Sequence, residues 1–198
     1  MLRLVFLYRD TAYLCHMSLR DQLSNRLGKT EIQQLCSLCK GVENPLKEEL
    51  YTLIFDTDKR VSDNAAWVMT HMGNENRRFL QSHIVDLMAE AMHTTSESKC
   101  RLLLTLLRKQ KFTADSIDSD FLDFCLANII EYSKPVGIKA MCLHLAYEQC
   151  RFYPELTGEL RLTLDLLDNS GQQAGMRSAR RNTIKKIENL QTNNSNEK

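Results

Sequence analysis

Apolar side chains recur along most of the chain at spacings of three and four residues, the pattern that predicts amphipathic α-helices. Asn44 and Pro45 supply an N-cap and a first helical residue, and glycines such as Gly28 and Gly41 end helices. The pattern and these end signals predict helices at 18–27, 30–41, 45–54, 61–72, 75–92, 97–109, 118–132, 135–150, 154–167 and 172–190.

A short motif returns about every forty residues in the second helix of successive pairs. A polar or basic residue is followed by a small one at Asn64-Ala65, Lys99-Cys100, Lys139-Ala140 and Arg177-Ser178. The first helices of the pairs share a stripe of their own, because Phe79-Leu80 and the residues after it match Phe121-Leu122. Two helix series with one average period favour a true repeat over chance likeness between amphipathic helices.

Two of the predicted helices differ in their apolar patterns, as expected for an inner and a terminal helix of a stacked array. The 97–109 helix carries leucines nearly all round, which predicts burial on every side in the middle of a stack. The last helix carries a single apolar stripe, from Met176 to Leu190, as a terminal unit with one solvent face should. The sequence therefore predicts an all-α fold of about four stacked helical hairpins.

The paired helices, and the small residues Ala65, Cys100, Ala140 and Ser178 near the start of each second helix, resemble the HEAT/armadillo-like superfamily. The segments Ala65-Ala66-Trp67 and Tyr153-Pro154-Glu155-Leu156 are similar to small bacterial proteins of this type. The resemblance covers about residues 30–190, although the usual Asp and Arg of HEAT repeats are present only in part, as Asp63 and Arg177. It implies a right-handed α-α superhelix whose concave face is lined by the second helices.

The amino-acid composition is that of an ordinary globular protein and does not identify a binding partner. Hydrophobic content of 43% and charged content of 26% are ordinary for a globular chain. The formal net charge of +1 is too small for binding to nucleic acid driven by bulk charge, although residues 172–198 are locally basic. Seven cysteines, an odd number scattered through helices, suggest buried free thiols in the reducing cytoplasm, the expected localisation.

We expect residues 17–190 to form a single domain. The apolar run within residues 1–16 is too short for a signal peptide. Because the first proper helix begins at Ser18, translation is expected to start at Met17, and residues 1–16 are interpreted as a doubtful N-terminal extension. Residues 191–198 are polar and are predicted to form a disordered tail. No stretch approaches the roughly eighteen apolar residues that cross a membrane, so no membrane association is expected.

Cys36-x-x-Cys39 has the spacing of half a zinc site. No second Cys or His pair follows at a matching distance, and Cys15 with His16 would complete the set only from the doubtful N-terminus. One helical turn apart, the two thiols are better explained as packing groups. Signatures of nucleophilic or phosphate-binding sites are missing, so no metal, cofactor or catalytic residue is predicted.

The resulting hypothesis is a non-enzymatic scaffold that binds a macromolecule, most plausibly a protein, on the face formed by the second helices. The candidate binding residues are Asn64, Lys99, Lys139, Arg177 and Arg181. The alternative is a DNA-binding protein or DNA alkylation-repair glycosylase, which the fold resemblance implies. In that case Asp63 and Trp67 would share a concave cleft with basic residues of later repeats.

Overall fold

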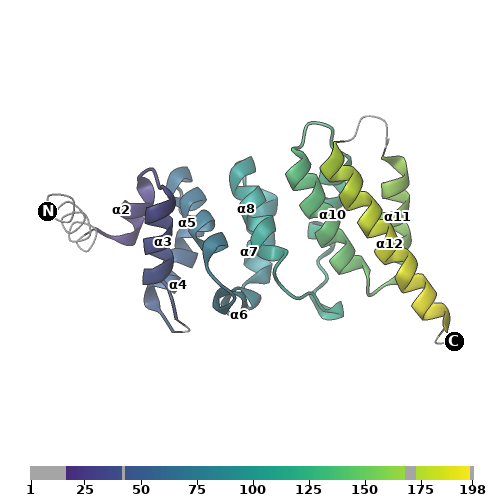
Figure 1. Ribbon diagram of the computed structural model, residues 1–198, viewed down its shortest axis with the longest axis horizontal. Helices are drawn as coiled ribbons and strands as arrows, with labels where there is room; N and C mark the ends of the chain where they lie inside the picture. The colour runs from purple at the N-terminus through teal and green to yellow at the C-terminus, as the bar shows by residue number, and fades with distance from the viewer. Residues whose placement is uncertain (1–16, 42, 168–172, 197–198) are drawn as a thin grey trace, which may run out of the picture. The chain divides into compact units, whose positions relative to one another are not determined.

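The structure is a computed structural model, and it describes residues 17–41, 43–167 and 173–196. The expected N-terminal extension and the proposed start therefore lie largely outside the described residues. The described chain is all-α and divides into two compact units, residues 1–79 and 80–198 (Figure 1). The division falls within α6 (Glu75–Gln81), and each unit is described by itself.

The first unit is organised around α5 (Lys59–His71). This helix contacts α2 (Leu19–Ser24), α3 (Lys29–Leu38), α4 (Pro45–Thr52) and the 3₁₀ turn η1 (Leu53–Phe55). Its expected apolar stripe of Val61, Ala65, Val68 and Met69 is fully buried. As predicted, the Asn44 side chain caps α4, accepting a hydrogen bond from the backbone N–H of Leu46.

The second unit stacks three hairpins in two layers: α7 (Ile84–His93) with α8 (Glu97–Leu107), α9 (Ser119–Ile130) with α10 (Val136–Cys150), and α11 (Pro154–Leu166) with α12 (Ala174–Asn196) (Figure 1). Among the first helices, α9 contacts both α7 and α11 in one layer. In the other layer, α10 contacts both α8 and α12. The expected hairpin architecture is therefore present, with α4 and α5 as a further pair in the first unit.

Buried leucines explain why α8 and α10 pack against several neighbouring helices. Leu103, Leu104, Leu106 and Leu107 of α8 are buried, as predicted for a helix that is apolar nearly all round. In α10, Leu143 and Leu145 are fully buried on different sides of the helix because neighbours pack on several of its faces. A helix covered in this way leaves one narrow polar stripe to solvent.

Two element boundaries differ from the sequence prediction. The single helix expected over 75–92 is broken between α6 and α7, where the amide side chain of Gln81 bonds the backbone carbonyl and N–H of Lys111 at 2.8 and 2.9 Å. At the other end, α12 does not stop at Leu190. Of the tail expected over 191–198, residues 191–196 continue the helix and 197–198 lie outside the described residues. The Thr192 hydroxyl donates to the carbonyl of Glu188 at 2.9 Å.

Candidate binding face of the second helices

Three parallel helices of the second unit, α8, α10 and α12, present their polar stripes side by side. A Cβ at Gly137 would lie 3.8 Å from Cδ of Arg101, and Thr105 Oγ1 lies 3.5 Å from Sδ of Met141. Each contact links α8 to α10 at the same offset, 137 − 101 and 141 − 105, so these two helices run parallel.

The contacts between α10 and α12 show the same regularity. A Cβ at Gly175 would lie 3.5 Å from Val136, and the Lys186 ammonium lies 4.7 Å from the ring centroid of Tyr147. The two offsets, 175 − 136 and 186 − 147, are again equal. The second helices therefore form a layer in register. We call the surface of Arg101, Thr105, Arg108, Met141, His144, Glu148 and Lys186 the second-helix face.

Cations dominate one end of the second-helix face, where α8 and α10 finish. Arg108 and Arg151 are the C-cap residues of these helices, a position at which positive charge offsets the partial negative charge of the helix end. Glu148 lies between Arg151 (Nε–Oε2 3.3 Å) and Lys186 (Nζ–Oε1 3.9 Å). Arg101 and Arg108 form no ion pair with any residue that the structure describes.

The half-buried imidazole of His144 lies among these charges. Burial lowers its pKa, and the positive charges of Lys186, Arg108 and Arg151 lower it further, against an opposing contribution from Glu148. The neutral form of His144 is therefore favoured near neutral pH, and an added negative charge beside the ring would reverse that preference.

Two of the candidate binding residues predicted from sequence lie on exposed parts of α12. Arg177 and Arg181 are both exposed, the first in the opening turn of the helix. Neither arginine was used to define the second-helix face, because no contact given above joins it to α10. Both lie on α12, the helix that contributes Lys186 to that face. They remain candidates for an extension of that face.

The expectation that Lys99 is exposed is wrong. Lys99 is only 6% exposed, and its ammonium forms an ion pair with the carboxylate of Glu90 in α7. Lys139 is half-buried, and its charge acts on a carboxylate at the end of α9. Hydrogen bonds from Ser133 lower the pKa of Glu131, at the end of α9, and the charges of Lys134 and Lys139 add to that effect. Lys99 therefore faces inward within its hairpin, whereas Arg177, at the same position of the repeat, is exposed.

Asn64 also has an internal role. Its side-chain amide donates to the backbone carbonyls of Leu23 (2.8 Å) and Asn25 (3.0 Å), so it satisfies the C-terminal end of α2. Like Lys99, this residue follows the predicted repeat, but its polar group is used to hold the fold together.

Residues that the sequence reasoning missed define the second-helix face instead. Arg101 lies two residues after Lys99, about 200° further round the helix. The available signal was the polar stripe of Arg101, Thr105 and Arg108 in an otherwise apolar helix, which continues in α10 through Met141, His144 and Glu148. Sequence alone did not show that the two stripes are adjacent.

The alternative cleft residues Asp63 and Trp67 belong to α5 in the first unit. Asp63 lines an open hollow of about 590 Å³ with Ser24, Asp58, Lys59, Arg60 and Asn64, and its carboxylate pairs with Lys59 at 2.8 Å. Trp67 is half-buried, lies edge-on to His71 with ring centroids 5.9 Å apart, and does not line the hollow. The hollow is therefore lined by the carboxylate and not by the aromatic ring, and the shared cleft stays a hypothesis.

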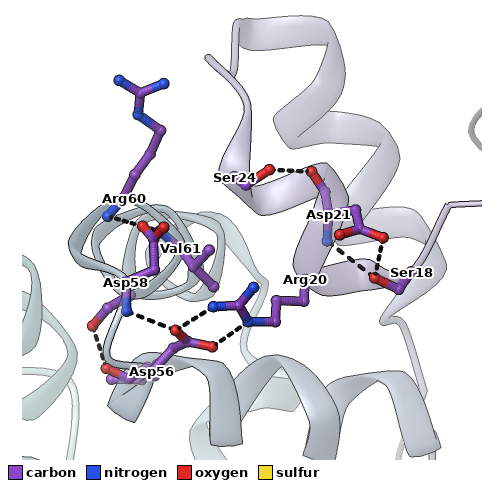
Figure 2. Close-up of polar contacts among 10 residues, drawn as sticks. Ser18, Arg20, Asp21, Ser24, Asp56, Asp58, Arg60 and Val61 are labelled. Atoms are coloured by element: carbon purple, nitrogen blue, oxygen red, sulfur yellow. Dashed lines mark hydrogen bonds and ion pairs between the residues drawn. The ribbon is translucent and has the colours of Figure 1, made fainter.

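The polar network beside this hollow joins α2 to the start of α5 (Figure 2). The Arg20 guanidinium donates twice to the Asp56 carboxylate, at 2.7 and 3.0 Å, and Asp56 accepts the backbone N–H of Asp58 at 2.7 Å. The Arg20 hydrogen bond is the main cause of a lowered Asp56 pKa. Asp58 in turn caps α5 by accepting the backbone N–H groups of Arg60 and Val61. This cluster has a structural role.

The Cys36-x-x-Cys39 pair does not converge on a shared ligand position. Cys36 Sγ contacts the carbonyl of Val68 and Cys39 Sγ that of Leu46, each at 3.6 Å. Burial raises the pKa of Cys39 to about 11. Across the described ranges, no group of three His, Cys, Asp or Glu side chains could hold a metal ion. Nor is any described helix both long and apolar enough to cross a membrane.

Comparison with known families decides the class of this protein. A family model for the HEAT repeat domain matches residues 19–187. The chain belongs to the HEAT repeat family. The match covers both compact units and all four helical hairpins. No curated protein and no solved structure matches the chain. As a HEAT repeat protein, it is a helical-repeat scaffold of a class that often mediates protein interactions.

Proposed function

We propose that this HEAT repeat chain is a non-enzymatic scaffold that binds a partner protein on the second-helix face. The observation that carries the proposal is the register of α8, α10 and α12. It aligns the stripe of Arg101, Thr105 and Arg108 with that of Met141, His144 and Glu148. A broad surface of this kind, with half-buried apolar atoms among exposed charges, is typical of protein interfaces.

The internal contacts of the fold support the choice of this face. Some cations of the second unit are paired within the chain, as Arg161 is with Asp165 (3.2 Å) and Glu188 (3.3 Å). Arg101 and Arg108 have no such pairing among the described residues. An arginine without an internal carboxylate partner can pair with a group on another molecule without breaking a contact of the fold.

The test compares capture of partners by the tagged full chain and by an Arg101→Glu variant. Lysate of the source cells is divided into nuclease-treated and untreated samples, and captured proteins are identified by mass spectrometry. Arg77→Glu is the matched control because Arg77 is an exposed arginine of the first unit. The thermal unfolding of each variant is measured first to confirm that it folds.

A protein that survives nuclease treatment, is captured by the Arg77→Glu control and is lost with Arg101→Glu supports the proposal, once it binds the purified chain directly. Capture that is equal for both variants would refute the second-helix face. Capture that disappears after nuclease treatment would favour the alternative of a nucleic-acid partner.

A further inference from the structure

The cationic end of the second-helix face has features that specify the chemistry of a partner. Arg108 closes α8, His144 lies on the neighbouring stripe of α10, and Lys186 reaches across from α12. At this point, the described residues do not supply one carboxylate for each cation. Glu148 lies within 4 Å of both Arg151 and Lys186, and Arg108 forms no ion pair with a described residue. Positive charge is therefore in excess at the cluster of Arg108, His144, Arg151 and Lys186.

This excess is held in place by the fold. The Arg151 guanidinium stacks over the ring of Phe152 at 4.7 Å and donates to the carbonyl of Phe112 at 3.3 Å. Lys186 lies over the ring of Tyr147, itself only 8% exposed. Cations anchored on aromatic rings lose less conformational freedom when they bind an anion than cations on free chains do.

We propose that this cluster binds an acidic segment of the partner protein, with carboxylates of the segment pairing with Arg108 and Lys186 beside His144. The inference rests on the proposed function and adds the class of partner to it. The cluster supplies the cations, and Met141, half-buried one helical turn before His144, supplies an apolar contact that a purely electrostatic site would lack.

An acidic peptide fits this cluster better than a nucleic acid does. Glu148 lies at the centre of the cluster, and the C-terminal ends of α8 and α10 add partial negative charge there. A continuous phosphate backbone would be repelled by these groups, whereas separate carboxylates can pair with Arg108 and Lys186 and avoid Glu148. Bases would also need aromatic platforms, and the rings of Tyr147 and Phe152 beside the cluster already carry Lys186 and Arg151.

Binding of a carboxylate at this position should be linked to protonation of His144. The groups that face the ring are Lys186 of α12, Arg108 at the end of α8, and Glu148 and Arg151 of α10. In the free protein, burial and the three cations disfavour the imidazolium. A bound carboxylate favours it, so the complex takes up a proton and the affinity rises as the pH falls through the pKa of the bound state.

The experiment measures binding of the full chain to a fluorescein-labelled peptide of repeated Glu-Glu-Leu triplets by fluorescence anisotropy. A peptide of Gln-Gln-Leu triplets controls for apolar contact, and single-stranded oligo-dT is the phosphate probe. We expect the glutamate peptide alone to bind, and added salt to weaken that binding. Arg108→Gln and Lys186→Gln should each weaken it about two- to fivefold, and the double variant about tenfold. Arg77→Gln should leave it unchanged.

The pH dependence of binding tests the role of His144 directly, because a purely structural role of that residue would not make the affinity depend on pH. Affinity for the glutamate peptide should be about threefold or more higher near pH 5.5 than near pH 7.5, a range in which the peptide carboxylates stay ionised. The His144→Gln variant should bind with no such dependence. Equal binding of the Glu and Gln peptides, or full binding by the double variant, would overturn the inference, as would oligo-dT that binds equally well and competes.

These outcomes separate the inference from the proposed function. If partner capture depends on Arg101 while the glutamate peptide fails to bind, the second-helix face stands and its acidic ligand is rejected. If the peptide binds but capture ignores Arg101, the cluster binds anions and the wider face is not the interface.

Discussion

The buried ion pair of Lys99 and Glu90 gives a test of the inward orientation of Lys99. Because the two side chains are unequally exposed, removing one partner should cost more stability than removing the other. The Lys99 side chain is 7% exposed and the Glu90 side chain 24%. Removing Glu90 strands a buried ammonium, which ordinarily costs about 3–5 kcal/mol. The glutamine amide oxygen of a Glu90→Gln variant can still accept one hydrogen bond, so we expect a loss of about 2–3 kcal/mol.

The reciprocal change should cost much less. Lys99→Met keeps the unbranched stem that packs in the hairpin and leaves Glu90 partly in contact with water, so we expect a loss of about 1 kcal/mol or less. At about 2–4 °C per kcal/mol for a chain of this size, Glu90→Gln lowers Tm by about 4–12 °C and Lys99→Met by at most about 4 °C. The double variant should fall close to Lys99→Met, because no buried charge is left unpaired.

The assay is thermal and urea unfolding followed by far-UV circular dichroism, with the transition of the second unit fitted separately if the two units unfold in steps. The Arg101→Gln variant is the control for loss of a nearby exposed cation. A Lys99→Met variant less stable than Glu90→Gln would refute the reasoning. So would a Lys99→Met variant of unchanged stability that loses partner binding, because Lys99 would then be a ligand residue.

Three further predictions concern single contacts. Asn64→Ala should destabilise the first unit by about 1–2 kcal/mol, because two hydrogen bonds to the end of α2 are lost, and limited proteolysis should then cut α2 first. Among the six described cysteines, iodoacetamide near pH 8 should alkylate the half-buried Cys36 first. Burial raises the pKa of Cys39 and Cys100 to about 11, so early labelling of either would contradict their burial. For His144, the unfolded state binds a proton more readily than the folded state does, so stability should fall as the pH drops from about 7 to 5. Urea unfolding should show this loss in the parent protein and a flatter profile in His144→Gln.

The sequence predicted the architecture well because apolar periodicity reports directly on burial. The stripe from Val61 to Met69 and the all-round leucines of α8 are buried as expected. A helix break that coincides with long-range contacts could not be predicted. The helix expected over 75–92 contains no proline or central glycine, and the bonds of Gln81 at the interruption reach Lys111, thirty residues away.

The candidate site was predicted less well for a geometric reason. A forty-residue period identifies equivalent positions, but it does not say which side of a helix those positions face. Lys99 and Lys139 were chosen because they repeat, yet Lys99 faces the first helix of its own hairpin. The side that reaches solvent depends on how α8 packs against α10, which single-helix patterns do not contain.

In α8, one side of the helix holds the hairpin together and another side faces solvent, so the chain can keep its repeat and still present a specific surface. Lys99, facing Glu90, and Arg101, facing solvent beside Gly137, are separated by two residues, a little over half a helical turn. Lys99 contributes to the stability of its hairpin through Glu90, whereas Arg101 and Arg108 form no ion pair with any described residue. Substitutions at Arg101, Arg108 and His144 should therefore change binding with small effects on unfolding, and substitution of Glu90 should do the reverse.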